Sequence, residues 1–237
     1  MKKLLLAGAA ALAMATAAQA DNSTSTVTQS NSGNEATVDQ TGSLAGGAST
    51  ITQSGMDNDA TVTQADDGSD LLGAAPPINF SQITQTGNEN EATVSQDTGT
   101  ASILTESFID QSGDRNMASV TQVDDDQYSS IIQTSSDNMA MVSQGEPSQV
   151  AGDESYGNTS LINQGGAGSH SATVEQAGRQ SFSDIAQTGF NNEAFVRQGI
   201  WSNSHESYIN QSGDNNVARV DTQGADIFGP LDNSNYN

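Results

Sequence analysis

Glutamine is the residue whose type and spacing could carry chemistry in this chain. Two sets of glutamines recur within a repeated pattern, Ser-x-(Ile/Val)-x-Gln, a short turn, then Ala-x-Val-x-Gln. Each carboxamide has both hydrogen-bond donors and acceptors, so a stacked copy can donate to one neighbour and accept from the other. The expected chemistry is therefore hydrogen bonding between copies of the same residue, and not catalysis.

The first half of the pattern occurs eight times, with successive glutamines 22 to 32 residues apart. A period in this range is typical of a solenoid or an array. The recurring positions are Ser25, Ser49, Ser81, Ser107, Ser129, Ser160, Ser183 and Ser207; Val27, Ile51, Ile83, Ile109, Ile131, Ile162, Ile185 and Ile209; and Gln29, Gln53, Gln85, Gln111, Gln133, Gln164, Gln187 and Gln211.

The second half of the pattern is equally regular, except that Gln223 is displaced by one residue in the last unit. Its positions are Ala36, Ala60, Ala92, Ala118, Ala140, Ala172, Ala194 and Ala218; Val38, Val62, Val94, Val120, Val142, Val174, Val196 and Val220; and Gln40, Gln64, Gln96, Gln122, Gln144, Gln176 and Gln198.

The elements that position these residues are strands, because fixed and variable residues alternate and successive side chains on a strand point to opposite faces. The sequence predicts an all-β fold, a cross-β-like β-solenoid of eight strand-turn-strand repeats forming two stacked parallel sheets. Fixed positions would then form ladders about 4.8 Å apart around a thin, dry interior. The repeats span 25–40, 49–64, 81–96, 107–122, 129–144, 160–176, 183–198 and 207–223, with irregular loops between them, notably 65–80 and 145–159.

The turn within each unit contains glycine and asparagine, which both tolerate the positive φ of a tight reversal. Asn31 and Ser135 replace the glycine in the first and fifth units, and one extra residue around His170 predicts a bulged turn in the sixth. The turn residues are Gly55, Gly87, Gly113, Gly166, Gly189 and Gly213, with Asn34, Asn58, Asn90, Asn116, Asn138, Asn192 and Asn216.

The N-terminal residues 1–20 are typical of a secretory signal peptide, with Lys2 and Lys3, an apolar run and Ala18-Gln19-Ala20. We expect cleavage after Ala20, a short segment 21–24 before the repeats, a polar tail over 224–237, and no membrane span in the mature chain. The chain has no cysteine, so disulfides do not hold the fold. Outside the predicted leader the chain has four basic residues, all arginines, and 29 acidic residues. Its net charge is therefore strongly negative, which makes nucleic acid an unsuitable partner.

The repeats resemble those of the curlin family, whose members are secreted subunits of curli, the bacterial functional amyloid fibres of biofilm matrix. The stretches that carry the resemblance are Ser49 to Gln64, Ser81 to Gln96, Ser107 to Gln122 and Ser183 to Gln198, and it extends over about Ser25 to Gln223. It implies a left-handed β-solenoid that polymerises end to end at the bacterial cell surface, in adhesion and surface colonisation. It also implies partners: further copies of the chain, other curli-like subunits, and a secretion channel with an accessory chaperone.

This chain departs from familiar curlins in having more repeats, longer connections, and no Gly-rich segment between the leader and the first repeat. A surface-bound nucleator subunit shares the same repeats as a major fibre subunit, so that alternative stays open. A monomeric solenoid with an ice-binding or adhesin face is a further alternative. Thr26, Thr28, Thr50 and Thr52 begin an outward threonine array, which breaks from Asp110 onward.

We expect no enzyme activity, no cofactor and no metal site. His170 in a turn and His205 in a connection are interpreted as solvated residues, since no nucleophile or acid pair accompanies them. The Asp-rich connections lack a calcium β-roll repeat and are interpreted as solvated loops, although oxygen-rich loops of this kind can bind Ca²⁺. An outward aromatic patch is expected from Trp201, Phe108, Phe195 and Tyr208.

Outward carboxylates precede the inward alanine in four units, at Glu35, Asp59, Glu91 and Glu193. Like charges on neighbouring strands repel. We therefore expect assembly to be slow at neutral pH and low salt and faster near pH 4, where carboxylates begin to protonate.

Overall fold

The computed structural model describes residues 23–43, 46–66, 79–98, 104–123, 126–145, 156–199 and 204–222. The predicted leader, Gln223, the tail, Trp201 and most of the two long loops lie outside the described residues.

Within the described ranges the chain forms sixteen strands and no helix. They are β1 (Thr24–Ser30), β2 (Glu35–Ser43), β3 (Gly47–Ser54), β4 (Asp59–Asp66), β5 (Asn79–Gln85), β6 (Glu91–Thr98), β7 (Thr105–Gln111), β8 (Met117–Val123), β9 (Tyr128–Gln133), β10 (Met139–Gln144), β11 (Thr159–Gln164), β12 (Ser171–Gln176), β13 (Phe182–Phe190), β14 (Glu193–Gln198), β15 (Glu206–Asp214) and β16 (Val217–Thr222).

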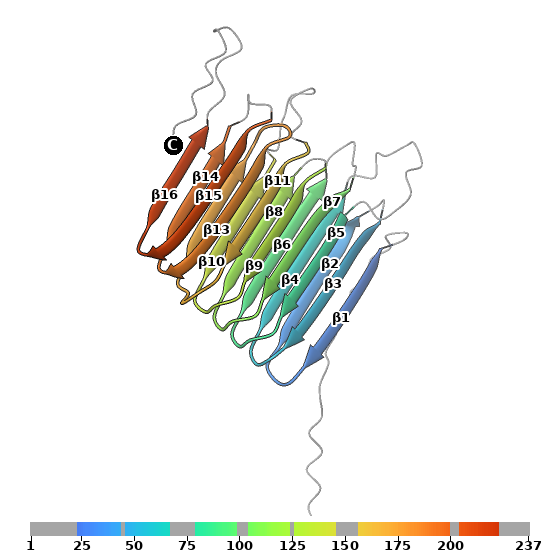
Figure 1. Cartoon of the computed structure of the whole chain (residues 1–237). Coiled ribbons are helices and arrows are strands. Elements are labelled where there is room, and N and C mark those ends of the chain that lie inside the picture. The colour runs from blue at the N-terminus through green and yellow to red at the C-terminus, as the bar shows by residue number, and fades with distance from the viewer. Residues whose placement is uncertain are drawn as a thin grey trace, which may run out of the picture.

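The strands alternate between two parallel sheets, each of eight strands. The odd sheet contains β1, β3 and so on to β15, and the even sheet contains β2 to β16, each in sequence order. Figure 1 shows the strands stacked along one axis, with the turns inside the units at one side and the connections between units at the other. The predicted β-solenoid is therefore confirmed. We call each strand-turn-strand unit a rung, numbered from rung 1 (β1 and β2) to rung 8 (β15 and β16).

The register between neighbouring rungs places like residues side by side. In the odd sheet Ser49 pairs with Ser81, Ile51 with Ile83, and Gln53 with Gln85. In the even sheet alanine pairs with alanine, valine with valine and glutamine with glutamine, as between β10 and β12. Slipping by one residue would turn every inward side chain outward, so the alternating pattern fixes this register.

The core is a single layer of aliphatic side chains between the two sheets. Ile51, Ile83 and Val62 are fully buried, and the alanines beside them are small enough to let the sheets approach closely. In rungs 1 and 8 the equivalent valines, Val27, Val38 and Val220, are only partly buried, although Ile209 of rung 8 is buried. The interior is therefore complete in the middle rungs and open at both ends.

The turn geometry agrees with the prediction at Asn31, which has a φ of 72°, but it differs at the recurring asparagines, Asn34 and its equivalents, which do not have positive φ. The residue before the asparagine has it, with φ between 54° and 61° in six of the described turns. These residues are Asp57, Glu89, Arg115, Asp137, Asn191 and Asn215. The prediction considered only which residue types tolerate positive φ, whereas the asparagine side chains are used for hydrogen bonds between rungs.

Glycine is required in these turns for more than its φ. Gly189 has a φ of 103°, but Gly87 lies outside the left-handed region. A Cβ atom on Gly87 would lie 1.8 Å from the carbonyl oxygen of Gly113 in the next rung. Glycine at this position therefore allows one turn to stack directly on the next.

Candidate self-assembly site

The glutamines of the odd sheet form one uninterrupted ladder of hydrogen bonds. In each step Nε2 donates to Oε1 of the glutamine in the next rung, at 2.7 to 3.0 Å. The ladder runs through Gln29, Gln53, Gln85, Gln111, Gln133, Gln164, Gln187 and Gln211. Every step has the same sense, so the ladder donates toward the C-terminal end of the solenoid.

These amides also hold the two sheets together. Nε2 of Gln85 donates to the backbone oxygen of Asp59 at 2.9 Å, in addition to its bond to Gln111. Nε2 of Gln111 bonds the backbone oxygen of Glu91 in the same way, at 2.9 Å. Burying an unpaired amide would be costly, but these inward amides have partners for both the N–H and the C=O.

The even sheet has a second glutamine ladder of the same sense, with Nε2 to Oε1 distances of 2.8 to 3.0 Å. It runs through Gln40, Gln64, Gln96, Gln122, Gln144, Gln176 and Gln198. In rung 8 the register places Thr222 beside Gln198. The Thr222 hydroxyl donates instead to the backbone oxygen of Arg197, at 3.3 Å. Among the described residues the second ladder therefore ends at Gln198, in rung 7.

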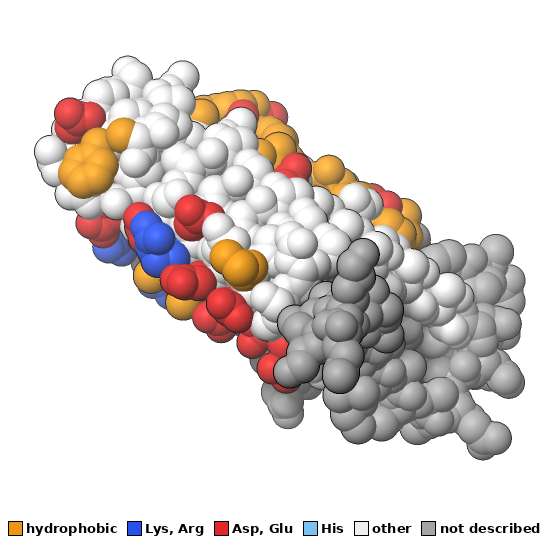
Figure 2. All heavy atoms as spheres, turned by 90° about the horizontal axis from the view of Figure 1, so that it is seen from below, with side chains coloured by type: hydrophobic (Ala, Val, Ile, Leu, Met, Phe, Trp, Pro, Cys, Tyr) orange, Lys and Arg blue, Asp and Glu red, His pale blue; other side chains and the backbone are white. Residues whose placement is uncertain are grey.

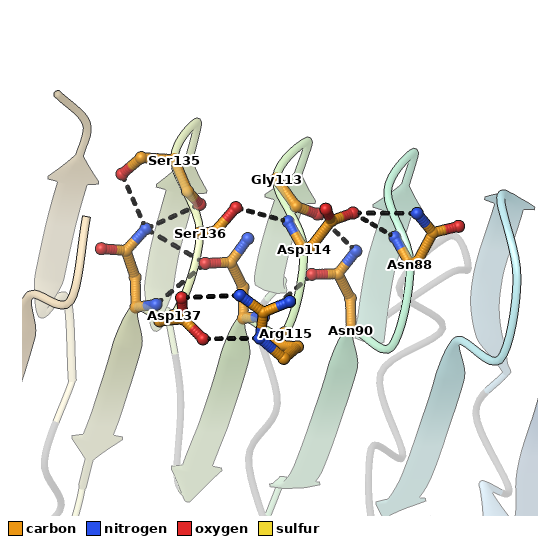
Figure 3. Close-up of polar contacts among 10 residues, drawn as sticks. Asn88, Asn90, Gly113, Asp114, Arg115, Ser135, Ser136 and Asp137 are labelled. Atoms are coloured by element: carbon orange, nitrogen blue, oxygen red, sulfur yellow. Dashed lines mark hydrogen bonds and ion pairs between the residues drawn. The ribbon is translucent and has the colours of Figure 1, made fainter. Parts of the chain in front are cut away.

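The turn asparagines form a third ladder of opposite sense. The backbone N–H of each residue in this column donates to the side-chain acceptor of the preceding rung, as from Asn90 to Oδ1 of Asn58 at 3.0 Å. Nδ2 also donates to a turn carbonyl in most rungs, as from Asn90 to Gly113 at 2.8 Å (Figure 3), whereas Nδ2 of Asn116 has no hydrogen-bond partner among the described residues. The bonds from backbone N–H to Oδ1 in this column therefore run toward the N-terminal end, opposite to the bonds of the glutamine ladders.

His170 takes the place of asparagine in rung 6. Its backbone N–H donates to Oδ1 of Asn138 at 3.0 Å, and its Nδ1 lies 3.2 Å from the backbone nitrogen of Asn192. Its Nε2 lies 2.7 Å from the carbonyl oxygen of Gly165. Since the amide N–H needs an acceptor and the carbonyl needs a donor, Nδ1 accepts and Nε2 carries the proton.

His170 is therefore not solvated, as the sequence had led us to expect, but 1% exposed. The extra residue of rung 6 is accommodated in the turn, where Gly168 and Ser169 both have positive φ. This additional length lets the larger imidazole reach the asparagine column. The bulged turn was predicted, but the role of the histidine inside it was not.

A further row of bonds follows the outer surface of the turns (Figure 3). The backbone N–H of Asn88 donates to Oδ1 of Asp114 at 2.9 Å, and that of Asp114 to the Ser136 hydroxyl at 3.1 Å. Beside this row Arg115 and Asp137 form a bidentate ion pair at 2.7 and 2.9 Å. The hydrogen bond from Arg115 lowers the pKa of the Asp137 carboxyl below its usual value. Both side chains are about half exposed, so the pair contributes little to stability.

The inward serine column is buried but forms fewer bonds than its regularity suggests. The hydroxyl of Ser129 donates to that of Ser107, and Ser183 to Ser160, each at 3.3 Å. The buried hydroxyls of Ser49 and Ser81 have no hydrogen-bond partner among the described residues. The hydroxyls of this column therefore do not form a continuous ladder like that of the glutamines.

Sequence reasoning missed one buried polar column, two residues before the serine in rungs 3 to 7. Asn79, Thr105, Gln127, Asn158 and Ser181 are all at most 1% exposed. Asn158 links two connections, with Nδ2 2.8 Å from the oxygen of Gly178 and Oδ1 accepting from the N–H of Ser181 at 2.9 Å. The residue type in this column varies from rung to rung. The only signal in the sequence is that the position is polar in each of these five rungs.

The outer faces of the two sheets differ. Figure 2 shows hydrophobic side chains along one long side of the molecule, with charged ones more frequent along the other. On the odd sheet Phe80, Phe108 and Tyr128 stack with centroids 5.5 and 5.7 Å apart. On the same sheet Phe182 and Tyr208 stack at 5.5 Å.

The single aromatic patch predicted from the sequence is wrong. Phe108 and Tyr208 lie on the odd sheet, whereas Phe195 lies on the even sheet under the Arg219 guanidinium, 4.6 Å from the ring centroid. The prediction grouped outward aromatics without assigning them to a sheet.

The threonine array is short: Thr26 pairs with Thr50, but Gln82 takes the next position in that column, one rung before the break expected at Asp110. The odd sheet pairs Thr28 with Thr52 and Thr52 with Thr84, and then Asp110 takes the next position in that column. The even sheet pairs Glu35 with Asp59 and Asp59 with Glu91, so three outward carboxylates stack on adjacent strands. The described outer faces are thus mixed in chemistry and not a uniform array.

Other kinds of site are not visible in the described part of the chain. Its residues include no group of three or more His, Cys, Asp or Glu placed to hold a metal ion. They also include no helix long and apolar enough to cross a membrane. The fold and the three ladders define a parallel β-solenoid with exposed ladder ends. No protein-family model, curated protein or solved structure matches this chain.

Proposed function

We propose that this chain is the structural subunit of a secreted, curli-like amyloid fibre that assembles end to end for biofilm matrix, adhesion and surface colonisation. The observation that carries the proposal is the complementarity of the two solenoid ends. The repeat pattern that resembles curlins and the leader-like N-terminus support export to the bacterial cell surface. A secretion channel with its chaperone, and other curli-like subunits, are the partners that this proposal requires.

The N-terminal end presents acceptors in both glutamine columns. Gln29 and Gln40 donate inward to rung 2, and no described residue donates to their Oε1 atoms. Rung 1 is also poorly buried, with the strand β1 exposed or half-buried throughout. This end therefore offers unpaired strand edges together with amide oxygens.

The C-terminal end presents the matching donor. Nε2 of Gln211 donates to the backbone oxygen of Glu193 at 2.9 Å, and no further rung uses its second N–H among the described residues. In the turn column the positions are reversed, because Asn216 donates to Oδ1 of Asn192 and no described residue donates to Oδ1 of Asn216. A second copy whose rung 1 stacked on rung 8 would pair a donor with an acceptor in the odd-sheet glutamine column and in the turn column. Two like ends would instead oppose acceptor with acceptor or donor with donor.

Backbone pairing would follow the same step. Open strand edges pair with other strands unless they are capped or charged. The new junction would repeat the register found between every pair of rungs, with Ser25 on Ser207, Val27 on Ile209 and Gln29 on Gln211. The junction between chains would then resemble the junction between rungs within one chain.

The test is to purify residues 21–237 and to follow assembly by thioflavin-T fluorescence, electron microscopy and fibre diffraction. The proposal predicts fibres with a meridional spacing of roughly 4.8 Å and an equatorial spacing of roughly 10 Å. A stable soluble monomer under all assembly conditions would contradict it. That outcome would favour a monomeric binding solenoid.

A further inference from the structure

Three of the six methionines of the chain lie together on the outward face of the even sheet. Met117 is on β8, and Met139 and Met141 are on β10, the next strand of that sheet. We call these three residues the methionine cluster. Of the others, Met1 and Met14 lie within the predicted leader and Met56 lies in a turn.

The register brings the three side chains within reach of one another. Met117 and Met139 are direct partners on adjacent strands, which separates their backbones by about 4.8 Å. Met139 and Met141 are two residues apart on one strand, so they project from the same face about 7 Å apart. Methionine has three rotatable side-chain bonds, so the three sulfurs can converge on one point above the sheet.

The backbone under the cluster is held in place. The carbonyl oxygen of Met117 accepts from Nε2 of Gln133 at 3.1 Å, and that of Met139 from Nε2 of Gln164 at 2.9 Å. The side chains themselves remain accessible, with Met117, Met139 and Met141 between 42% and 46% exposed. The cluster is thus a fixed platform with three free thioethers.

The surroundings of the cluster supply few competing ligands. The outward neighbours of these methionines in the register are Ser119, Ser171 and Thr173, with Glu91 on the other side of Met117. Hydroxyl groups are weak ligands, and one carboxylate does not make a site for a hard cation such as Ca²⁺ or Mg²⁺. Thioether sulfur is a soft ligand that selects soft ions such as copper(I).

We propose that the methionine cluster binds one soft monovalent cation, copper(I) or silver(I), through the three thioether sulfurs. The binding needs no redox step, because the ion is taken up in the oxidation state in which it is supplied. It is independent of fibre formation, since the cluster lies on the outer face of rungs 4 and 5 and not at either end of the solenoid.

The experiment is a titration of the purified protein with silver(I) nitrate in chloride-free buffer, followed by calorimetry. The wild-type protein should bind one equivalent of silver(I) per chain at this site. The triple variant M117L/M139L/M141L should lose that equivalent. Leucine keeps the volume and apolar character of methionine but removes the sulfur, so the fold should be retained.

Met56→Leu is the matched control, because it removes an equally exposed sulfur outside the cluster, and it should leave the binding unchanged. The proposal is overturned if the wild-type protein binds no silver(I), or if the triple variant keeps the same equivalent. The latter result would assign the ion to His205 or to carboxylates.

A second measurement uses the unaltered chain, in case the triple variant does not fold. X-ray absorption at the copper K-edge of the copper(I) complex should show a shell of sulfur atoms only. A shell containing nitrogen or oxygen from the protein would contradict binding by the three thioethers.

Discussion

Rung 1 and rung 8 end the same ladders in different ways. Rung 1 keeps both glutamines of the repeat, Gln29 and Gln40, and each has a ladder partner on one side only among the described residues. Rung 8 keeps Gln211 in the odd sheet, but in the even sheet Thr222 occupies the position of the glutamine. The two ends are therefore not interchangeable, because one offers two amide acceptors and the other offers one amide donor and a hydroxyl.

The largest effect is expected from an inward charge at rung 8. Val220 faces the interior and is partly buried, whereas Val217 on the same strand faces outward and is 74% exposed. Val220→Lys should stop elongation at the C-terminal end, because an inward lysine blocks pairing of a strand edge. The rate of seeded fibre growth measures this effect. The control is Val217→Lys, whose fibres should still elongate. Equal inhibition by both variants would contradict growth through the β16 edge.

The second prediction compares interior and terminal rungs. Gln85 has ladder partners on both sides, whereas Gln29 has only one. Gln85→Ala should lower the free energy of unfolding by about 3 kcal/mol, since it leaves two buried groups unpaired, and Gln29→Ala by about 1 kcal/mol.

The control for this pair is Gln82→Ala, which removes an exposed glutamine from the same strand as Gln85. It should change the free energy of unfolding by less than about 0.5 kcal/mol. Urea denaturation of the monomer below its assembly concentration measures all three variants. Similar losses for Gln85 and Gln82 would show that the ladder does not stabilise the fold.

The contrast between inward and outward positions also determines what could be predicted from the sequence. Strands, sheets and register followed from the fixed Ser, Ile, Ala, Val and Gln positions, because every rung repeats the same inward residues. The geometry of the turn did not follow, because Asn90 and its equivalents serve as acceptors for the next rung instead of adopting positive φ. Residue type alone does not separate these two uses of asparagine.

Positions that break the repeat were also the hardest to predict. The buried position of His170 could not be predicted, because it depends on the space that the longer turn of rung 6 provides. The aromatic residues were misjudged because their contacts depend on which sheet each strand joins. Both are properties of the three-dimensional neighbourhood and have no local signal in the sequence.

A third prediction restores the missing amide at rung 8. Thr222→Gln would give Gln198 a ladder partner like those in the other rungs, in place of its bond to the Ser207 hydroxyl at 3.0 Å. One added hydrogen bond should raise the free energy of unfolding by roughly 1 kcal/mol. It should also shorten the thioflavin-T lag, because both glutamine columns would then continue into the next chain. A longer lag would show that Thr222 assists the junction.

The fourth prediction concerns the carboxylates near rung 1. Glu91 stacks on Asp59, which stacks on Glu35, whereas Glu106 on the odd sheet lies between Phe80 and Tyr128. Glu91→Gln should shorten the lag at neutral pH and low salt more than Glu106→Gln, although both remove one negative charge. The wild-type lag should be shorter near pH 4, where carboxylates protonate. A lag unchanged between pH 4 and pH 8 would refute this explanation.

The smallest effect is expected at His205, whose backbone oxygen accepts from Phe182 at 2.6 Å just before β15. Burial lowers the pKa of His205, so the native state binds fewer protons than the unfolded chain. Its contribution is therefore complete above the ordinary histidine pKa of about 6.5 and is lost as the pH falls below it. His205→Asn should remove this part of the pH dependence of urea denaturation. An unchanged pH profile would mean that His205 does not titrate with unfolding.

The most direct test of end-to-end stacking uses the absence of cysteine from the chain. Thr28 on β1 and Asn210 on β15 are exposed, and they occupy the same outward column of the odd sheet. If rung 1 of one copy stacks on rung 8 of another, their Cα atoms lie within the range of roughly 4.4 to 6.8 Å that a disulfide bridges. Oxidising fibres grown from mixed Thr28→Cys and Asn210→Cys chains should give dimers containing one chain of each kind. If dimers of two Thr28→Cys chains or of two Asn210→Cys chains formed as readily as the mixed dimer, that result would contradict the stacking of rung 1 on rung 8.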